Sequence, residues 1–251
     1  MPHPFANIGE PFIHFSQVGS TNDEARKAIQ NGLATHGMAF FSTNQVAGRG
    51  QRGRSWQGEP GASLALSVLI KTDFLTVLQQ FELSMAVALG VWEGVAVSTG
   101  SESLRIKWPN DLYWKDQKLG GILIESVLNT AGQWPWAIVG IGININQKIF
   151  DPALPNPISL FQISGQEQDP AAVAKRLCVT IGTYLEQLQE QKGTALLAAY
   201  NRLLYKKEQI VRFKSGDRLF SALVKEVSQQ GLLCLENEPH QYTTGSIEWI
   251  Q

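Results

Sequence analysis

Cysteine and histidine are scarce in this chain. Its 251 residues include 2 cysteines and 4 histidines. Cys178 and Cys234 lie far apart and form no Cys-x-x-Cys pair, so neither a disulfide framework nor a zinc ribbon is indicated. The histidines are scattered, which argues against a histidine metal cluster. Both cysteines are predicted to be buried thiols, the first in a helix and the second in a strand.

Excess charge and long apolar runs are also lacking. Lysine and arginine number 21 and aspartate and glutamate 22, and this net charge of −1 argues against a general polyanion binder. No run of about 18 apolar residues occurs, and Met1 to Asn7 contain neither a basic region nor an apolar stretch. With 43% hydrophobic residues the chain can fill a core. We therefore expect a cytoplasmic protein with no membrane partner.

Three common catalytic signatures are absent as well. There is no Gly-Lys-Ser or Gly-Lys-Thr for a phosphate loop, and Gly61 to Ala65 lack the second glycine of a nucleophile elbow. Neither His-Arg-Asp nor Asp-Phe-Gly occurs, although a protein kinase needs both. Hydrolase, P-loop ATPase and kinase functions therefore lose their main support.

What the chain does contain is a basic loop from Gln45 to Trp56, which reads Gln-Val-Ala-Gly-Arg-Gly-Gln-Arg-Gly-Arg-Ser-Trp. Its glycines can expose backbone N–H groups and its arginines supply fixed positive charge, a combination suited to an anion. A strand is expected on each side, whereas a dinucleotide-binding glycine motif needs a helix at its last glycine. Taken alone, such a loop is more often a flexible segment or a contact to nucleic-acid phosphates.

Two further segments bring polar groups to strand ends. The alternating segment 104–108 runs into a Pro-Asn-Asp turn, so a strand should deliver Lys107 and Asp111 to that turn. A second strand opens with Lys118 beside Gly120 and Gly121. These glycines indicate either a close approach of a ligand to the backbone or a bulge.

The segment 136–146 predicts a strand with one apolar face and one flat face. Period two places Gly140, Gly142 and Asn144 together, opposite the isoleucines. The alternating segment 63–70 likewise has one face of small residues. We expect the flat faces of these strands to combine into the floor of one pocket.

The remaining elements predict two domains. Ser20 or Thr21 is expected to cap a helix to about residue 30, and helices are expected at 76–97, 170–191 and 194–205, with an irregular connection at 147–169. Short strands and turns follow. The predicted division is a main domain of residues 1–205 and a small all-β, barrel-like domain of residues 206–251.

Taken together, five motifs resemble those of the biotin–protein ligases. They are Ser20-Thr21-Asn22, Gln45 with Gly48-Arg49-Gly50-x-x-Gly53-Arg54-x-Trp56, Lys107-Trp-Pro-Asn-Asp111, Lys118-Leu-Gly-Gly121 and Gly140-x-Gly142-x-Asn144. Their order and spacing match from about residue 13 onward. The resemblance implies an α+β fold, with a mixed β-sheet catalytic domain, helices on one side and a small C-terminal SH3-like β-barrel.

The resemblance also implies a two-step reaction with ATP, biotin and Mg²⁺. The biotin carboxylate attacks the α-phosphate of ATP, giving biotinyl-5′-AMP and pyrophosphate. A lysine of a biotin carboxyl carrier protein then attacks the acyl carbon, and AMP leaves. Because negative charge builds at phosphorus, this chemistry needs nearby cations more than acid–base groups.

Site residues are implied in the same way. The biotin-binding set is Ser20, Thr21, Asn22, Gln45, Arg49, Gly50, Gln51, Lys118, Gly120 and Gly121. The ATP-binding set is Arg49, Arg52, Arg54, Trp56, Lys107, Asn110, Asp111 and Asn144. Lys118 is the expected main catalytic residue, bridging the biotin carboxylate and the α-phosphate. Lys107 and Asp111 assist, and Asp111 is also the candidate ligand for Mg²⁺.

Two departures from the family matter. Gln51 stands where the family usually has an arginine that helps the loop close over the acyl-adenylate, so weaker retention of the intermediate is expected unless Arg52 substitutes. Some members also carry an N-terminal helix-turn-helix repressor domain. Only about a dozen residues precede the first expected strand here, so we expect no specific DNA binding and no repressor function.

Alternative functions remain open. A lipoate-protein ligase or octanoyltransferase shares the catalytic fold, although Gln45 and the segment from Lys107 to Asp111 argue against it. A non-catalytic Gly-Arg module for nucleic acid belongs to a different class; near-neutral net charge and the lack of aromatics between the arginines disfavour it. A free edge of the main sheet would allow a homodimer.

Overall fold

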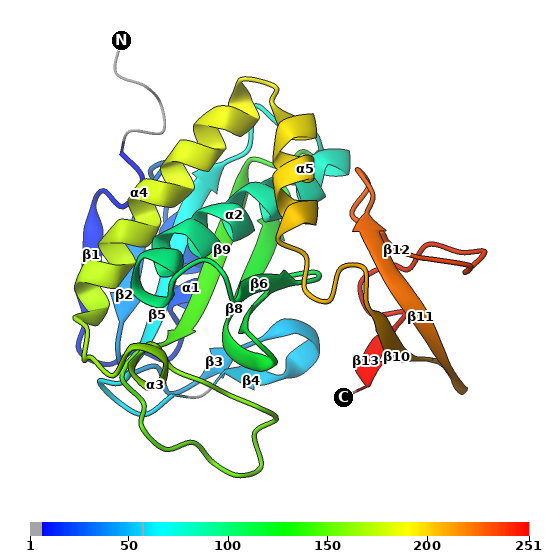
Figure 1. The fold of residues 1–251 in the computed structure, drawn as a ribbon. Helices are drawn as coiled ribbons and strands as arrows, with labels where there is room; N and C mark the ends of the chain where they lie inside the picture. Colours follow the sequence, from blue (N-terminus) through cyan, green and yellow to red (C-terminus); the bar gives the residue numbers. More distant parts are fainter. Residues whose placement is uncertain (1–6, 57, 251) are drawn as a thin grey trace.

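The computed structural model describes residues 7–56 and 58–250. Its centre is a seven-stranded mixed sheet of order β1-β2-β5-β9-β8-β7-β6, in which β1 and β2 run parallel and the other neighbours antiparallel (Figure 1). The strands are Phe12–Phe15 (β1), Ala39–Ser42 (β2), Ser63–Lys71 (β5), Leu104–Lys107 (β6), Asp111–Trp114 (β7), Gln117–Val127 (β8) and Trp136–Asn144 (β9). The mixed sheet confirms this part of the predicted fold.

The strands β5 and β9 at the middle of the sheet are buried along most of their length on both faces, whereas their alternating residues predicted one core face and one face of small residues. Leu64 and Leu66 of β5 belong to the main hydrophobic cluster, whereas Leu69 belongs to a smaller cluster on the other face. Ala65 pairs with Gly142 of β9, so small residues lie side by side on the face opposite the main cluster. The sheet is therefore flat at this point.

Helices cover both faces of the sheet. The helices α2 (Gln80–Thr99), α4 (Pro170–Gln189) and α5 (Gly193–Arg202) lie on one face, as expected (Figure 1). The helix α1 (Thr21–Gln30) packs on the opposite face, where Ala25 contacts the cluster that contains Leu69. The expectation of helices on one side was thus incomplete, because the ten-residue α1 also has an apolar stripe to bury.

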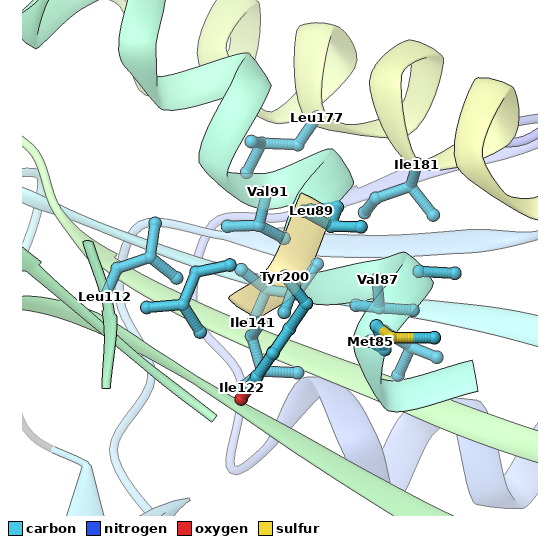
Figure 2. Packing of buried hydrophobic residues seen from close by; sticks show 14 of the residues in the cluster. Met85, Val87, Leu89, Val91, Leu112, Ile122, Ile141, Leu177, Ile181 and Tyr200 are labelled. Atoms are coloured by element: carbon cyan, nitrogen blue, oxygen red, sulfur yellow. The ribbon is translucent and has the colours of Figure 1, made fainter. Parts of the chain in front are cut away.

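The helix α2 is the centre of the main core. Figure 2 shows Val87, Leu89 and Val91 of this helix among side chains of α4 and of the sheet, with Tyr200 of α5 between them. The helical stretch 77–99 is long and apolar enough to cross a membrane, judged by length and composition alone. Of its most apolar 18-residue window, 56% is buried inside the protein. Leu78 lies before α2, in the short 3₁₀ turn Val77–Gln79, and is 94% exposed.

Two connections differ from the sequence-based expectation. The irregular segment 147–169 contains a short helix, α3 (Leu160–Ser164), which Ser159 caps by accepting a hydrogen bond from the Gln162 N–H at 3.2 Å. The Gly-Arg loop joins β2 to β5 as predicted, and it also forms a hairpin of its own. The hairpin consists of β3 (Gly48–Arg49) and β4 (Ser55–Trp56), with a 3₁₀ turn at Gln51–Gly53 between them.

The C-terminal residues form a four-stranded antiparallel sheet of order β12-β11-β10-β13. Its strands are Ile210–Ser215 (β10), Arg218–Val227 (β11), Leu233–Leu235 (β12) and Glu248–Ile250 (β13). Phe213 and Val224 belong to the same hydrophobic cluster as the main sheet, and the Trp108 indole N–H donates to the Gly231 carbonyl at 3.0 Å. The two sheets therefore share one core.

The cysteines are both free, in the predicted types of element. Cys178 lies buried in α4, and burial raises the pKa of its thiol to about 12. Cys234 lies in β12 but is only half-buried, so the expectation of a buried thiol was wrong there. The strand β12 lies at an edge of its sheet, and Cys234 alternates there with the buried Leu233 and Leu235.

Candidate functional site

A cavity of about 430 Å³ opens where β5, β8 and β9 present their flat face. Its floor includes Ala65, Gly121, Gly140 and Gly142, as the alternation of these strands predicts. The Gly-Arg loop and residues 244–249 of the C-terminal sheet form its walls. The predicted site residues that line it are Ser20, Thr21, Asn22, Gln45, Arg49, Gly50, Gln51, Arg52, Arg54, Trp56, Lys107, Asn110, Asp111, Lys118, Gly121 and Asn144.

Gly120 is the one predicted site residue outside this lining, so it should be removed from the set. A Cβ atom on Gly120 would lie 2.6 Å from the Gly142 carbonyl oxygen and would also collide with Ile143. Both contacts are to the neighbouring strand β9. This glycine therefore allows close packing within the sheet, and its neighbour Gly121 is the one that faces the cavity.

One end of the cavity is neutral and polar. Ser20 is the N-cap of α1, yet its side chain makes no capping hydrogen bond, so the expected capping box does not form. Instead, Gln45 reaches the helix start, where its Oε1 accepts a hydrogen bond from the Thr21 N–H at 2.8 Å and lies 3.2 Å from the Thr21 hydroxyl. An element far along the chain thus takes over the role of the cap.

Behind this end lie two residues that the sequence-based set did not include. Ser67 of β5 is fully buried, with its Oγ 2.7 Å from the Thr21 hydroxyl and 2.5 Å from Oδ1 of Asn22. Glu125 of β8 accepts a hydrogen bond from the Asn22 side-chain amide at 2.6 Å. Glu125 interrupts an apolar strand, and that break in the pattern was the signal available in the sequence.

The flat glycine face is covered by side chains of this same site. A Cβ on Gly140 would lie 2.5 Å from Oδ1 of Asn22, and one on Gly142 would lie 2.7 Å from Nε1 of Trp56. The glycines therefore let an amide and an indole lie against the sheet. Asn144 lines the cavity beside them, with its side-chain amide donating to the Ile158 carbonyl at 3.0 Å.

The opposite end of the cavity carries cations. The Lys118 ammonium lies 2.7 Å from Oδ2 of Asp111, and both side chains are partly exposed, at 32% and 26%. Both Lys107 and Asp111 lie at a turn, as predicted, and the hairpin of β6 and β7 also pairs them directly in register. Asn110 is held differently, because its amide donates to the Ile122 carbonyl.

Lys107 sits in an aromatic cage that the sequence did not reveal. Its Nζ lies 4.6 Å from the ring centre of Tyr113, 5.6 Å from that of Trp249 and 5.8 Å from that of Tyr205. Burial lowers the pKa of Lys107 to about 8; Asp111 opposes this shift, and Lys118 adds to it. In the free protein, Lys107 therefore loses its positive charge at a lower pH than an ordinary lysine does.

The three arginines of the loop have different surroundings. Arg49 makes a bidentate ion pair with Asp23, at 2.9 and 2.5 Å, which lowers the pKa of the Asp23 carboxyl. Arg52 has a φ of 57° and its guanidinium lies against Gly245 of the C-terminal sheet. Within the described part of the chain, Arg54 has no carboxylate within ion-pair distance, so its charge is available to the cavity.

Comparison with known proteins gives a consistent result. Residues 15–144 match the model of the biotin/lipoate A/B protein ligase family. The bifunctional ligase/repressor BirA of Escherichia coli is 32% identical over 88% of this chain and 68% of its own length, and a biotin–[acetyl-CoA-carboxylase] ligase of Mycobacterium tuberculosis is 28% identical over 88% and 81%.

Solved structures agree on the fold. The biotin protein ligase from Aquifex aeolicus, in complex with biotin and ATP, superposes with a TM-score of 0.80 at 23% identity, covering 95% of this chain and 98% of that one. The family match includes every site residue from Thr21 to Asn144, and the cavity lies among these residues. By sequence and by fold, this chain belongs to the biotin/lipoate A/B protein ligase family.

Proposed function

We propose that this protein is a biotin–protein ligase, which activates biotin with ATP and transfers it to a lysine of a biotin carboxyl carrier protein. The observation that carries the proposal is the difference in polarity between the two ends of this cavity. The neutral end of the cavity, at Thr21 and Gln45, suits an uncharged amide-like group. The other end contains the cations Lys107, Lys118 and Arg54. Biotin has a ureido ring at one end and a carboxylate at the other, where the phosphates must meet it.

The residues divide the work along the cavity. Lys118 can release Asp111 and bridge the biotin carboxylate and the α-phosphate, which brings the two anions together and offsets the charge that builds at phosphorus. Lys107 and Arg54 neutralise the remaining phosphates, and Trp56 and Asn144 border the nucleotide. In the second step, the carrier amine forms an amide bond with the acyl carbon while the bond to AMP breaks.

Mg²⁺ would enter this site with the nucleotide. Among the described residues, no group of three or more metal-binding side chains occurs, and the carboxylates that line the cavity are those of Asp111, paired with Lys118, and Glu248. One carboxylate suits Mg²⁺ that is held mainly by phosphate oxygens and water. Bound there, Mg²⁺ would neutralise phosphate charge, and Asp111 would hold it in place once Lys118 turns to the ligand.

The pyrophosphate released with Mg-ATP tests this function. Biotin, lipoate and octanoate are supplied in separate reactions, and release is expected with biotin alone. Release with lipoate or octanoate instead would move the protein to the lipoate branch of the family. No release with any of the three, together with stabilisation by an oligonucleotide, would favour the nucleic-acid module.

The lowered pKa of Lys107 predicts a pH dependence of ATP binding. Phosphates bind the charged lysine, and this charge is lost as the pH rises through about 8. The Kd for Mg-ATP should therefore increase above pH 8, by up to about tenfold per pH unit. Calorimetric titrations from pH 7 to 10 measure this, and Lys107→Arg should be flat over that range because arginine stays charged. An unchanged wild-type Kd at pH 10 would contradict it.

Gln51 predicts loss of the intermediate. It lines the cavity in the 3₁₀ turn of the loop, and the guanidinium of the neighbouring Arg52, which also lines the cavity, lies against Gly245 of the C-terminal sheet. Biotinyl-5′-AMP should therefore leak from the wild type in the absence of carrier, and Gln51→Arg should reduce the leakage rate several-fold. Release of labelled adenylate into a filtrate is the measurement; equal rates in both proteins would refute this role.

The domain organisation and assembly are part of the same proposal. Residues 1–205 form the catalytic domain, and residues 206–251 form an SH3-like barrel, which the four C-terminal strands and their shared aromatic core support. We expect a cytoplasmic enzyme without specific DNA binding. The strand β1 lies at one edge of the main sheet and would allow a homodimer. Gel shifts on a biotin-operon promoter and light scattering test these two points.

A further inference from the structure

We propose that Glu125 is a positioning residue that sets the hydrogen-bond polarity at the neutral end of the cavity and thereby selects acids that carry N–H donors. The inference rests on the proposed biotin ligase function. Neither Glu125 nor Ser67 is among the described residues that line the cavity, but both are connected to it through Asn22. One chain of hydrogen-bonding side chains runs from Glu125 through Asn22, Ser67 and Thr21 to Gln45.

Glu125 fixes the orientation of Asn22. Its Oε1 accepts a hydrogen bond from the Arg26 guanidinium at 3.1 Å, and its Oε2 lies 2.6 Å from the Asn22 amide nitrogen. A carboxylate can only accept, so the NH₂ group of Asn22 must face it. The amide oxygen of Asn22 therefore points toward Ser67, at 2.5 Å.

Ser67 transmits this orientation to Thr21. Ser67 has one hydroxyl proton but lies close to two oxygens, 2.5 Å from Asn22 Oδ1 and 2.7 Å from Thr21 Oγ1. The amide oxygen can only accept, so it takes the Ser67 proton. The two hydroxyl oxygens lie 2.7 Å apart, so the Thr21 hydroxyl must then donate its proton to the Ser67 oxygen.

With its proton committed to Ser67, Thr21 presents a lone pair to the cavity. Thr21 Oγ1 and Gln45 Oε1 lie 3.2 Å apart, so two acceptors stand side by side. A bound ligand must supply N–H groups there, as a ureido ring does. A ligand without such donors leaves the Thr21 hydroxyl oxygen without a donor, and Gln45 Oε1 keeps only the hydrogen bond from the Thr21 N–H. Sites with such unsatisfied acceptors discriminate strongly against that ligand.

The substitution Glu125→Gln reverses the chain with a change of one atom. Arg26 keeps the carbonyl oxygen of the new side chain, so its NH₂ group faces Asn22 and the Asn22 amide must flip. Ser67 then accepts from Asn22 and donates to Thr21, and Thr21 donates to Gln45. The two acceptors at the cavity now satisfy each other, and ligand N–H groups have no partner.

The experiment measures binding of three acids to wild type and Glu125→Gln without ATP. The acids are biotin, desthiobiotin, which keeps the ureido ring, and octanoate, which has no N–H group. Octanoate binding is measured by competition with a fluorescent nucleotide adduct or directly by calorimetry. We expect biotin and desthiobiotin to weaken by about tenfold or more. Octanoate should bind equally well or better, so the ratio of biotin to octanoate affinity falls.

Matched variants distinguish a change in hydrogen-bond direction from a general disturbance of the packing around the site. Ser67→Ala breaks the chain at its middle and should lower the same ratio, which keeps the test valid if Glu125→Gln folds poorly. Ser42→Ala removes another fully buried serine, in β2, and Glu24→Gln makes the same chemical change in an exposed pair with Lys27; neither should alter the ratio.

Two outcomes overturn the inference. If all three acids weaken equally in Glu125→Gln, the residue only supports the shape of the site; if none changes, it has no part in recognition. A wild type that binds octanoate but not biotin would instead overturn the proposed function, so the two failures are distinguishable.

Discussion

Lys118→Ala is expected to lower the rate of pyrophosphate release with biotin and Mg-ATP by about 10² to 10³-fold. Lys118 opens β8 at the cationic end of the cavity, with its ammonium 2.7 Å from Asp111 and directly above Gly121. An interaction that strengthens as charge develops at phosphorus lowers the barrier more than it improves binding. The loss should therefore fall mainly on kcat, with a smaller change in the KM of biotin.

Two variants make this result specific. Lys118→Arg keeps the charge but has a larger planar head, and it should recover part of the rate. Lys175→Ala removes an exposed lysine of α4 that lies over the Phe12 ring, away from the cavity, and should leave the rate unchanged. If Lys118→Ala released pyrophosphate at the wild-type rate, the catalytic role would pass to Lys107 and Arg54.

Tyr200→Ala should give the largest loss of stability, about 3–5 kcal/mol in the free energy of unfolding. Tyr200 is completely buried in α5, among side chains of α2 and the sheet (Figure 2). Its ring packs edge-on against Phe81 at 5.7 Å between centroids. Its removal leaves a cavity between α2, α5 and the sheet that neighbouring side chains fill only in part. Urea denaturation followed by circular dichroism measures the change.

Smaller changes at the same place divide the effect. Tyr200→Phe keeps the ring but removes the hydrogen bond to the Pro109 carbonyl at 3.1 Å, for an expected cost of about 1 kcal/mol. Leu78→Ala, at a side chain that is 94% exposed, should stay within about 0.5 kcal/mol of the wild type. A loss below 1 kcal/mol in Tyr200→Ala would contradict the packing described for this core.

The sequence predicted the elements of the fold better than their arrangement. Alternation located β5, β6 and β9 because successive residues of a strand face opposite sides of the sheet. The side of the sheet that α1 covers could not be predicted, since an apolar stripe does not say which surface will bury it. The shared core of the two sheets was missed for the same reason: Phe213 and Trp108 meet partners more than 20 residues away.

Prediction of the site was limited in the same way, because sequence motifs do not show which distant residues the fold brings to them. Residues inside motifs, such as Lys107 and Lys118, line the cavity as expected. The aromatic cage around Lys107 and the contact of Arg52 with Gly245 both depend on residues brought back from the C-terminal sheet. Gly120 was misassigned because two adjacent glycines in a strand face opposite sides, and only one of them can face a ligand.

The indole of Trp56 rests on the bare backbone of Gly142 at the cavity floor. A ligand entering there changes the polarity and the water content around a fluorescent group, so the protein carries its own optical reporter. Tryptophan fluorescence in a stopped-flow instrument can therefore follow the binding of each substrate. Trp56→Phe would remove the part of the signal that comes from Trp56, and what remains would report on Trp108 and Trp249, which also line the cavity.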